Sequence, residues 1–254
     1  MMQIGIIGGS GLDDPDILTN PQEVEIHTPY GSPSSKIMSG RIGDLGVFLL
    51  ARHGRNHQFS PTQVNNRANI HALKEAGATH ILATTACGSL RQEIDRGHFV
   101  ILDQFIDFTR FRKTSFVDSF ETGAVHTAMA HPFDQGLRLS LFDSAKALGF
   151  LVHKSGCVVT IEGPRFSTVA ESKMFRLWGA DVINMSTAPE AMLANEAGLP
   201  YAAVAMSTDY DCWKEDEDPV TWDDILAVFN QNADNVKSLL VKTIEDLTLT
   251  QEIN

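Results

Sequence analysis

Two acidic residues that follow an apolar run are the side chains best suited to acid–base chemistry. Asp209 and Asp211 come just after the run from Tyr201 to Ser207, two positions apart. If the chain leaves the strand in extended form, this spacing points both side chains to the same side. Adjacent carboxylates raise each other's proton affinity, so one of them can carry a proton near neutral pH. A metal pair or a solvated acidic turn is the competing interpretation, because acidic residues also fill positions 215–218.

Glycines and a cationic side chain after two other apolar runs indicate an anion site. The run Gly8-Gly9-Ser10-Gly11 offers backbone amides and a hydroxyl that together can hold a phosphate. Arg52 follows a later run, and its planar fork suits a phosphate group. A dinucleotide is the alternative ligand of the glycines, but the spacing GxGxxG is absent. A solvated surface turn is the alternative for residues 52–57.

Two histidines four positions apart, His53 and His57, raise the question of a metal ion. Gly54 lies between them and makes a helix doubtful, and no nearby carboxylate completes a ligand set. The three cysteines are far apart and include no CxxC pair, so neither a zinc site nor a disulfide framework is indicated. We therefore expect no metal.

Small, hydroxyl and aromatic side chains fill the segments after three more apolar runs. Residues 84–89 can line a sugar or a phosphate, although a tight turn would also need small side chains. Phe166, in the segment 162–167, can stack on a flat base, although core packing is the commoner role of phenylalanine. The segment 184–190 leads into a helix start. Ligands of open α/β sheets bind beyond the carboxyl ends of the strands, so these segments can converge on one site.

The elements that position these segments follow an alternating pattern, which predicts an α/β domain with a largely parallel or mixed sheet. Thr168 with Glu171, and Thr187 with Glu190, have the spacing of a capping box at a helix start. We expect strands at 3–7, 45–50, 80–85, 99–102, 157–161, 181–184 and 201–207, and further helices at 68–76, 134–148 and 221–247. Residues 109–131 have the weakest pattern, and long irregular loops of compact domains are often functional.

The bulk composition limits the class of protein. The chain has 254 residues, of which 43% are hydrophobic and 20% charged, so it is long enough to bury a substantial core. No linker or repeat divides it, and we expect one domain over residues 1–254. A formal charge of −12 argues against nucleic acid as a partner. The apolar runs are too short to span a membrane and the N-terminus lacks the features of a signal peptide, so we expect no membrane contact and a cytoplasmic location.

Six ordered motifs carry a resemblance to a known family over almost the whole chain. They are GIIGGSGLDD, RHGRNH, TTACGSL, TIEGPRFST, INMSTAPE and STDYDCWKE. Together they resemble the 5'-methylthioadenosine phosphorylases of the trimeric purine nucleoside phosphorylase family. The resemblance implies a single α/β domain whose central sheet is mixed, partly barrel-like and flanked by helices. It also implies a homotrimer or a dimer of trimers, with sites at subunit interfaces, and no metal or organic cofactor.

The resemblance also implies roles for particular residues. The phosphate site is expected to include Ser10, Arg52, His53, Thr85, Ala86 and Ser186. Met185 is expected under the ribose, and Ala86, Cys87, Phe166, Ser167, Asp209 and Asp211 around the purine. His57, Trp222, Ile225 and Leu226 are expected near the 5' substituent, and His126 is expected to come from the neighbouring subunit. The family commonly has threonine at the positions of Ser10 and Ser186, and an aliphatic residue at that of the bulkier Trp222.

The activity implied is a pentosyl transfer in purine and methionine salvage, in which phosphate cleaves methylthioadenosine to adenine and 5-methylthioribose 1-phosphate. Asp209, when protonated, can donate to the purine N7, and ionised carboxylates can accept from the 6-amino group of adenine. Relatives that prefer 6-oxopurines have asparagine in this turn. A 6-oxopurine or methylthioinosine phosphorylase, a nucleosidase that uses water, and a non-catalytic nucleotide-binding or scaffold protein are the alternatives.

Overall fold

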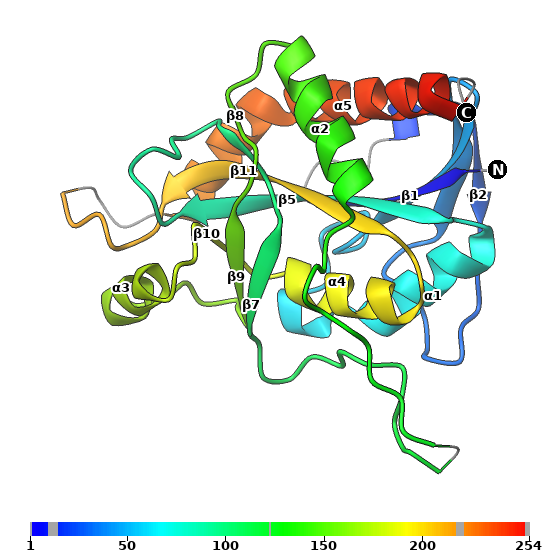
Figure 1. Cartoon of the computed structure of the whole chain (residues 1–254), viewed down its shortest axis with the longest axis horizontal. Coiled ribbons are helices and arrows are strands. Elements are labelled where there is room, and N and C mark those ends of the chain that lie inside the picture. Colours follow the sequence, from blue (N-terminus) through cyan, green and yellow to red (C-terminus); the bar gives the residue numbers. More distant parts are fainter. Residues whose placement is uncertain (1, 10–14, 122, 217–220, 252–254) are drawn as a thin grey trace.

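Eleven strands form one mixed sheet in the computed structural model of the chain, which describes residues 2–9, 15–121, 123–216 and 221–251 (Figure 1). The strands are β1 (Gln3–Gly8), β2 (Thr19–Val24), β3 (Ile37–Ile42), β4 (Leu45–Ala51), β5 (His80–Ser89), β6 (Phe99–Ile101), β7 (Gln104–Phe108), β8 (Val152–His153), β9 (Cys157–Ile161), β10 (Val182–Asn184) and β11 (Tyr201–Tyr210). The order β2-β3-β4-β1-β5-β10-β9-β7 forms the main path, and β11, β6 and β8 branch from β5.

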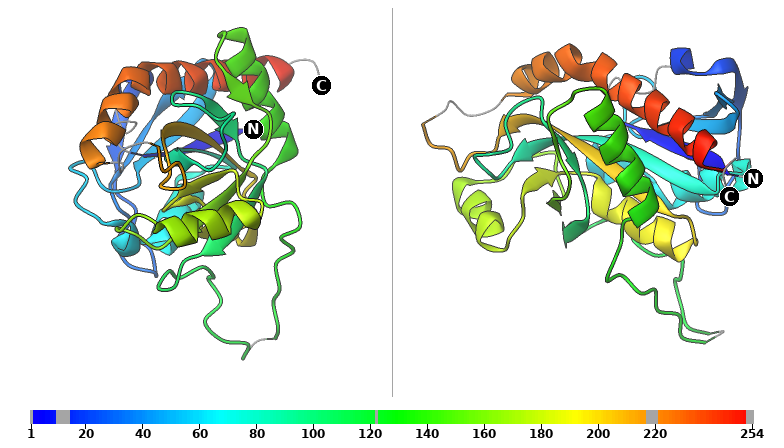
Figure 2. Two further views of the ribbon diagram at one scale, coloured as in Figure 1. Left: turned by 90° about the vertical axis from the view of Figure 1, so that its left-hand side faces the viewer. Right: turned by 45° about the horizontal axis from the view of Figure 1, so that its top comes forward.

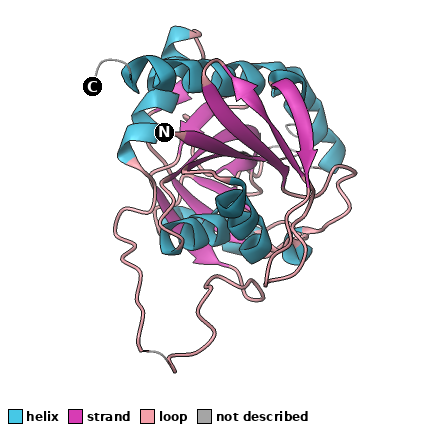
Figure 3. Ribbon diagram, turned by 90° about the vertical axis from the view of Figure 1, so that its right-hand side faces the viewer, coloured by secondary structure: helices cyan, strands magenta, loops and turns pink. Residues whose placement is uncertain are grey.

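The long strands β5 and β11 are the centre of this branching. They pair in parallel along most of their length. On its other side, β5 pairs in parallel with β1 through its first half and antiparallel with β10 near its end. One strand therefore joins three neighbours, and the sheet curls inside a shell of helices (Figure 3). The predicted fold class, a mixed sheet flanked by helices, is confirmed.

Helices cover the sheet in layers. The helices are α1 (Asn66–Ala76), α2 (Gln135–Ala147), α3 (Val169–Leu177), α4 (Thr187–Glu196) and α5 (Trp222–Gln251), with short 3₁₀ turns at Pro15–Ile17 and Pro61–Gln63. In Figure 1, α2 and α5 lie on one side of the sheet and α1 and α4 on the opposite side. Each pair buries its own apolar cluster against the strands, and a smaller cluster lies around Phe175 of α3.

The helix boundaries follow local capping chemistry at most predicted positions. The Asn65 side chain accepts a hydrogen bond from the first turn of α1, and that helix ends at Gly77, whose φ of 107° favours glycine. Thr168 and Glu171 form the predicted capping box of α3. The second predicted box is wrong, because Ser186 is the N-cap of α4, which places Thr187 inside the helix.

All seven predicted strands are observed. Four of them extend past their predicted ends, 157–161 agrees with its prediction, and the strands predicted at 99–102 and 181–184 are each one residue shorter than predicted. β5 and β11 continue to Ser89 and Tyr210, past their predicted ends, because each keeps a pairing partner there. The strands β2, β3, β7 and β8 were not predicted, since they are polar or very short and lack a clear apolar alternation. Apart from residue 122, which lies outside the described residues, the segment 109–131 contains no helix or strand and projects from the body (Figure 2).

Candidate active site

Segments at the ends of β1, β4, β10 and β11 meet the latter half of β5 at one pocket of about 630 Å³. This volume lies within the usual range for a small-molecule site. The structure brings thirteen of the predicted residues to its lining: Arg52, His53, His57, Thr85, Ala86, Cys87, Phe166, Ser167, Met185, Ser186, Asp209, Asp211 and Ile225. The convergence expected from the strand ends is therefore observed.

Four predicted site residues are not among this lining. Ser10 lies outside the described residues, as does the side chain of Trp222. Leu226 is half-buried in α5 but does not line the pocket. His126 is exposed on the projecting segment, where its ring packs edge-on against Phe120 at a centroid distance of 5.5 Å.

A buried ion pair forms one end of the pocket. The Arg52 side chain is 2% exposed and donates from Nε and Nη2 to the two carboxylate oxygens of Glu190, at 2.5 and 3.0 Å. Its Nη1 donates to the Thr84 carbonyl at 2.8 Å. These bonds use three of the five guanidinium N–H groups, so two have no partner among the described residues and can reach an anion. A Cβ at Gly9 would lie 3.2 Å from Nη1, so glycine lets the chain approach this cation.

Glu190 is one of the site residues that the sequence interpretation missed. It was assigned to a capping box, whereas its carboxylate binds Arg52 and also accepts a hydrogen bond from the buried Tyr201 hydroxyl at 2.9 Å. Glu190 is 1% exposed. The available signal was its isolation, because it is the one charged residue in the segment 186–195. A lone acid in an otherwise apolar helix needs a buried cation as its partner.

Hydroxyl groups and a helix N-terminus lie next to Arg52. Ser186 is the N-cap of α4, and its side chain makes no capping hydrogen bond. Its Oγ lies 3.3 Å from Oγ1 of Thr85, and both residues are buried. The backbone N–H groups and the dipole of a helix N-terminus favour an anion. An anion at this end of the pocket could therefore accept hydrogen bonds from these groups.

His53 has one defined tautomer in this environment. Its Nδ1 lies 2.8 Å from the carbonyl oxygen of Phe59, which can only accept, so Nδ1 carries the proton. Burial, followed by the neighbouring charge of Arg52, lowers the pKa of His53 to about 4. The ring is therefore neutral at pH 7, and its Nε2 is an acceptor. The ring of His57 stacks on it at a centroid distance of 4.6 Å.

The carboxylates of Asp209 and Asp211 form the opposite end. Both are buried, and β11 shifts its register by one residue between Ser207 and Asp209, a bulge of the kind found beside active sites. Thr208 Oγ1 donates to Asp209 at 2.8 Å, and Ser167 Oγ lies 2.6 Å from an oxygen of Asp211.

Gly88 lets Asp209 lie close to β5. A Cβ at Gly88 would come within 3.0 Å of Oδ2 of Asp209, so any side chain there would displace the carboxylate. The neighbouring Cys87 faces the same pocket, and burial raises the pKa of its thiol well above the usual value. Cys87 is therefore a small neutral surface beside two acids.

Glu162 and Arg112 hold the pocket walls together, which the sequence did not predict. The Glu162 carboxylate accepts from Thr62 Oγ1 at 2.7 Å, from Arg112 Nε at 2.7 Å, and from the backbone N–H groups of Arg110 and Phe111. Burial opposes its ionisation, but these donors lower the pKa of Glu162 to about 2. Arg112 also donates to the carbonyl of Met185 at 3.2 Å. Three wall segments that are distant in sequence are thereby fixed to one another.

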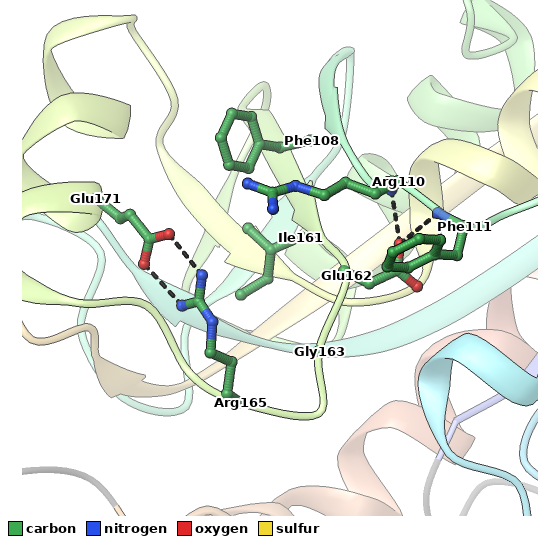
Figure 4. A pocket seen from close by; sticks show the side chains of 8 residues that line it. All are labelled: Phe108, Arg110, Phe111, Ile161, Glu162, Gly163, Arg165 and Glu171. Carbon is green, nitrogen blue, oxygen red and sulfur yellow. Dashed lines mark hydrogen bonds and ion pairs between the residues drawn. The ribbon is translucent and has the colours of Figure 1, made fainter.

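A smaller pocket of about 210 Å³ is lined by Glu162 and its neighbours Ile161 and Gly163 (Figure 4). Arg165 pairs with both carboxylate oxygens of Glu171 at its rim, and the Arg110 guanidinium lies 5.8 Å from the ring centre of Phe108. Phe111, which is 76% exposed, adds a second aromatic ring to the lining of this pocket. Across the described residues, no three histidine, cysteine or acidic side chains are grouped so that they could hold a metal ion.

Comparisons with known proteins agree with this geometry. The family model of the phosphorylase superfamily matches residues 3–245. An S-methyl-5'-thioadenosine phosphorylase of Xenopus tropicalis is 54% identical over 250 residues, which cover 97% of this chain and 89% of that protein. The chain belongs to the S-methyl-5'-thioadenosine phosphorylase family. The Danio rerio member is also 54% identical, again over 97% of this chain and 89% of its own.

Solved structures of this phosphorylase family have the same fold. A methylthioadenosine phosphorylase from Schistosoma mansoni in complex with adenine has a TM-score of 0.93 and 39% identity, and covers 98% of this chain and 93% of its own. A variant of the Schistosoma enzyme in complex with methylthioadenosine has a TM-score of 0.90 and 38% identity, over 98% and 92% of the two chains. No helix in the described parts of the present chain is long and apolar enough to cross a membrane.

Replacement of Glu190 by glutamine should affect both stability and phosphate use. The Glu190→Gln variant removes the charge that balances buried Arg52, so we expect the free energy of unfolding to fall by about 3–5 kcal/mol. The KM for phosphate should rise, because the guanidinium loses its fixed orientation. Urea unfolding and steady-state kinetics measure the two effects. The exposed Glu75→Gln on α1 is the control, and a Glu190→Gln protein with unchanged stability would contradict the assignment.

The neutral state of His53 predicts a dependence of stability on pH. The folded pKa of about 4 lies below the ordinary value of 6.5, so between these values the unfolded chain binds a proton that the folded chain refuses. This group should therefore reduce stability as the pH falls from 6.5 to 4. In phosphate-free buffer, the melting temperature of His53→Gln should fall less between pH 7 and pH 5 than that of the unmodified protein. Equal decreases would contradict a neutral, buried His53.

Proposed function

We propose that the protein cleaves methylthioadenosine with inorganic phosphate to give adenine and 5-methylthioribose 1-phosphate. One observation carries this proposal, namely that a single pocket has an anion-binding end at Arg52 and an acidic end at Asp209 and Asp211. The family membership supports the same reaction. Phosphate is a co-substrate in this reaction, and no metal or organic cofactor takes part. Both products are starting points for purine and methionine salvage.

The two ends of the pocket match the charges that develop when an N-glycosidic bond breaks. The sugar gains positive charge and the departing purine gains negative charge, so a catalyst must stabilise both. Phosphate bound at Arg52, Thr85 and Ser186 can stabilise the sugar cation and capture its anomeric carbon. At the other end, Asp209 in its protonated form can donate to N7 of the purine.

The preferences for base and 5' substituent follow from the same lining. The carboxylate oxygens of Asp211 are acceptors that suit the 6-amino group of adenine, and Ser167 fixes the orientation of this side chain. Near the 5' position, the buried Ile225 offers an apolar surface. A methylthio group gains about 1–3 kcal/mol there relative to a hydroxyl group, which loses hydration. A 6-oxopurine or methylthioinosine phosphorylase is less well matched, because its base presents a 6-oxygen to these acids.

We further propose that the chain acts as one domain in a homotrimer, or a dimer of trimers, in the cytoplasm. The segment 109–131, which projects from the body in Figure 2, carries exposed His126, Phe120 and Val125, and this supports a role at a neighbouring subunit's site. Exposed Phe111 and Leu177 offer additional apolar surface for contact between copies. All three cysteines are free thiols, as is usual in a reducing compartment.

An assay with and without phosphate tests the reaction. Methylthioadenosine, adenosine and methylthioinosine are each incubated with the protein, and the sugar product is identified by chromatography. We expect 5-methylthioribose 1-phosphate only when phosphate is present, with methylthioadenosine as the fastest substrate. Free methylthioribose at an equal rate without phosphate would show a nucleosidase, and a higher rate with methylthioinosine would overturn the adenine assignment.

The Asp209→Asn variant tests the proton donor. An amide cannot transfer a proton to N7, so we expect kcat to fall by about a hundred to ten thousand fold while KM changes far less. The control is Glu215→Asn. Glu215 is an exposed acidic residue in the turn after β11, so this variant should keep normal turnover. A near-normal kcat for Asp209→Asn would remove this residue from the mechanism.

A further inference from the structure

Asn184 lines the pocket next to Ser186, and its side chain has a fixed orientation. It is the last residue of β10 and is 5% exposed. Its oxygen Oδ1 accepts from Thr160 Oγ1 at 2.8 Å and from the backbone N–H of Ser186 at 3.4 Å. Its nitrogen Nδ2 donates to Thr85 Oγ1 at 3.2 Å and to Thr187 Oγ1 at 2.5 Å. A backbone N–H can only donate, so the contact with Ser186 determines which end of the amide is the oxygen.

The hydrogen bonds around Asn184 all run in one direction. The chain begins at the backbone N–H of Ala188, in the first turn of α4, which donates to Thr160 Oγ1 at 3.1 Å. Thr160 then donates to Asn184, and Asn184 donates to Thr85. Thr160 and Asn184 each accept a hydrogen bond from the group before them in the chain and donate one to the group after them. Hydrogen bonds in such a chain polarise one another in the same sense.

The direction of this chain determines what Thr85 can do. Because Asn184 donates to its Oγ1, the Thr85 hydroxyl cannot place its own proton on Asn184. In the structure that proton has the Ala86 carbonyl at 2.9 Å and the Ser186 hydroxyl at 3.3 Å as possible acceptors. Thr85, Ala86 and Ser186 all line the pocket, so an anion bound there can take the place of these acceptors.

We propose that Asn184 is a positioning residue that makes the Thr85 hydroxyl a hydrogen-bond donor to phosphate, an inference that rests on the proposed phosphorylase activity. It acts through Thr85 and without contact with the reacting atoms. We therefore expect Asn184 to affect the binding of phosphate and not the binding of the nucleoside. The nucleoside end of the pocket, at Asp209 and Asp211, contains none of the groups in this chain.

A double-mutant cycle tests this role, with inorganic phosphate as the probe. Thr85→Val should raise the KM for phosphate by roughly ten- to a hundredfold, the loss of one hydrogen bond to a charged group. Asn184→Ala should raise it by roughly three- to tenfold, while the KM for methylthioadenosine at saturating phosphate changes by less than about twofold. The double variant should be no worse than Thr85→Val alone, because Asn184 has nothing left to orient. Additive effects would overturn the proposal, as would an equal rise of both KM values.

Two further measurements keep the result interpretable. If Asn184→Ala does not fold, Asn184→Asp replaces it, because aspartate has the same size but no side-chain N–H. The loss of phosphate affinity caused by Asn184→Asp must then be smaller in the Thr85→Val protein than in the unmodified protein. Thr243→Val is the matched control, since this fully buried hydroxyl in α5 donates to the Leu239 carbonyl away from the pocket. It should lower stability and leave both KM values unchanged. A phosphate-independent rate in the unmodified protein would instead refute the proposed activity, before any variant is compared.

Discussion

The buried pair of Arg52 and Glu190 is the interaction on which the site depends. Removing either charge from water costs several kcal/mol, so neither side chain could stay inside without the other. The pair also joins the end of β4 to α4, and the Tyr201 hydroxyl extends the connection to β11. The guanidinium is thereby held in one orientation, and the pair as a whole carries no net charge. An anion that enters the pocket meets oriented N–H donors, and it does not have to displace a loosely held counter-charge.

The branching of the sheet explains why such distant residues meet. Strand β5 pairs with β1, β10 and β11, so the segments that follow those strands surround its latter half. The residues there are small, and Gly88 allows Asp209 to approach the backbone. A side chain at position 88 would crowd Asp209 and move its carboxylate. The glycine is therefore needed for the position that this acid has in the pocket.

The sequence predicted the parts of this site that follow from strand-end motifs, and it could not predict the parts that depend on tertiary contact. Arg52, Thr85 and Asp209 stand directly after or within apolar runs, so their convergence follows from the geometry of α/β sheets. Glu190 and Asn184 bind partners far away in the chain, and their local patterns suggested only a helix start and a strand end. The edge strands were missed for a related reason, since polar strands such as β2 are specified by their neighbour and not by their own alternation.

The two ends of the pocket differ in how completely this chain encloses them. Arg52, Thr85 and Ser186 are each no more than 7% exposed, so the phosphate end is enclosed by the chain itself. At the nucleoside end, His57 is exposed and Phe166 is 40% exposed. The gain of an apolar 5' group scales with the area removed from water, so the buried Ile225 contributes to it and the exposed surface at this end does not. In the proposed homotrimer, the projecting segment with His126 would add surface at this end of a neighbouring copy's pocket. On this argument, the proposed phosphate end is enclosed by the single chain, whereas the proposed homotrimer would complete the surface for the 5' substituent.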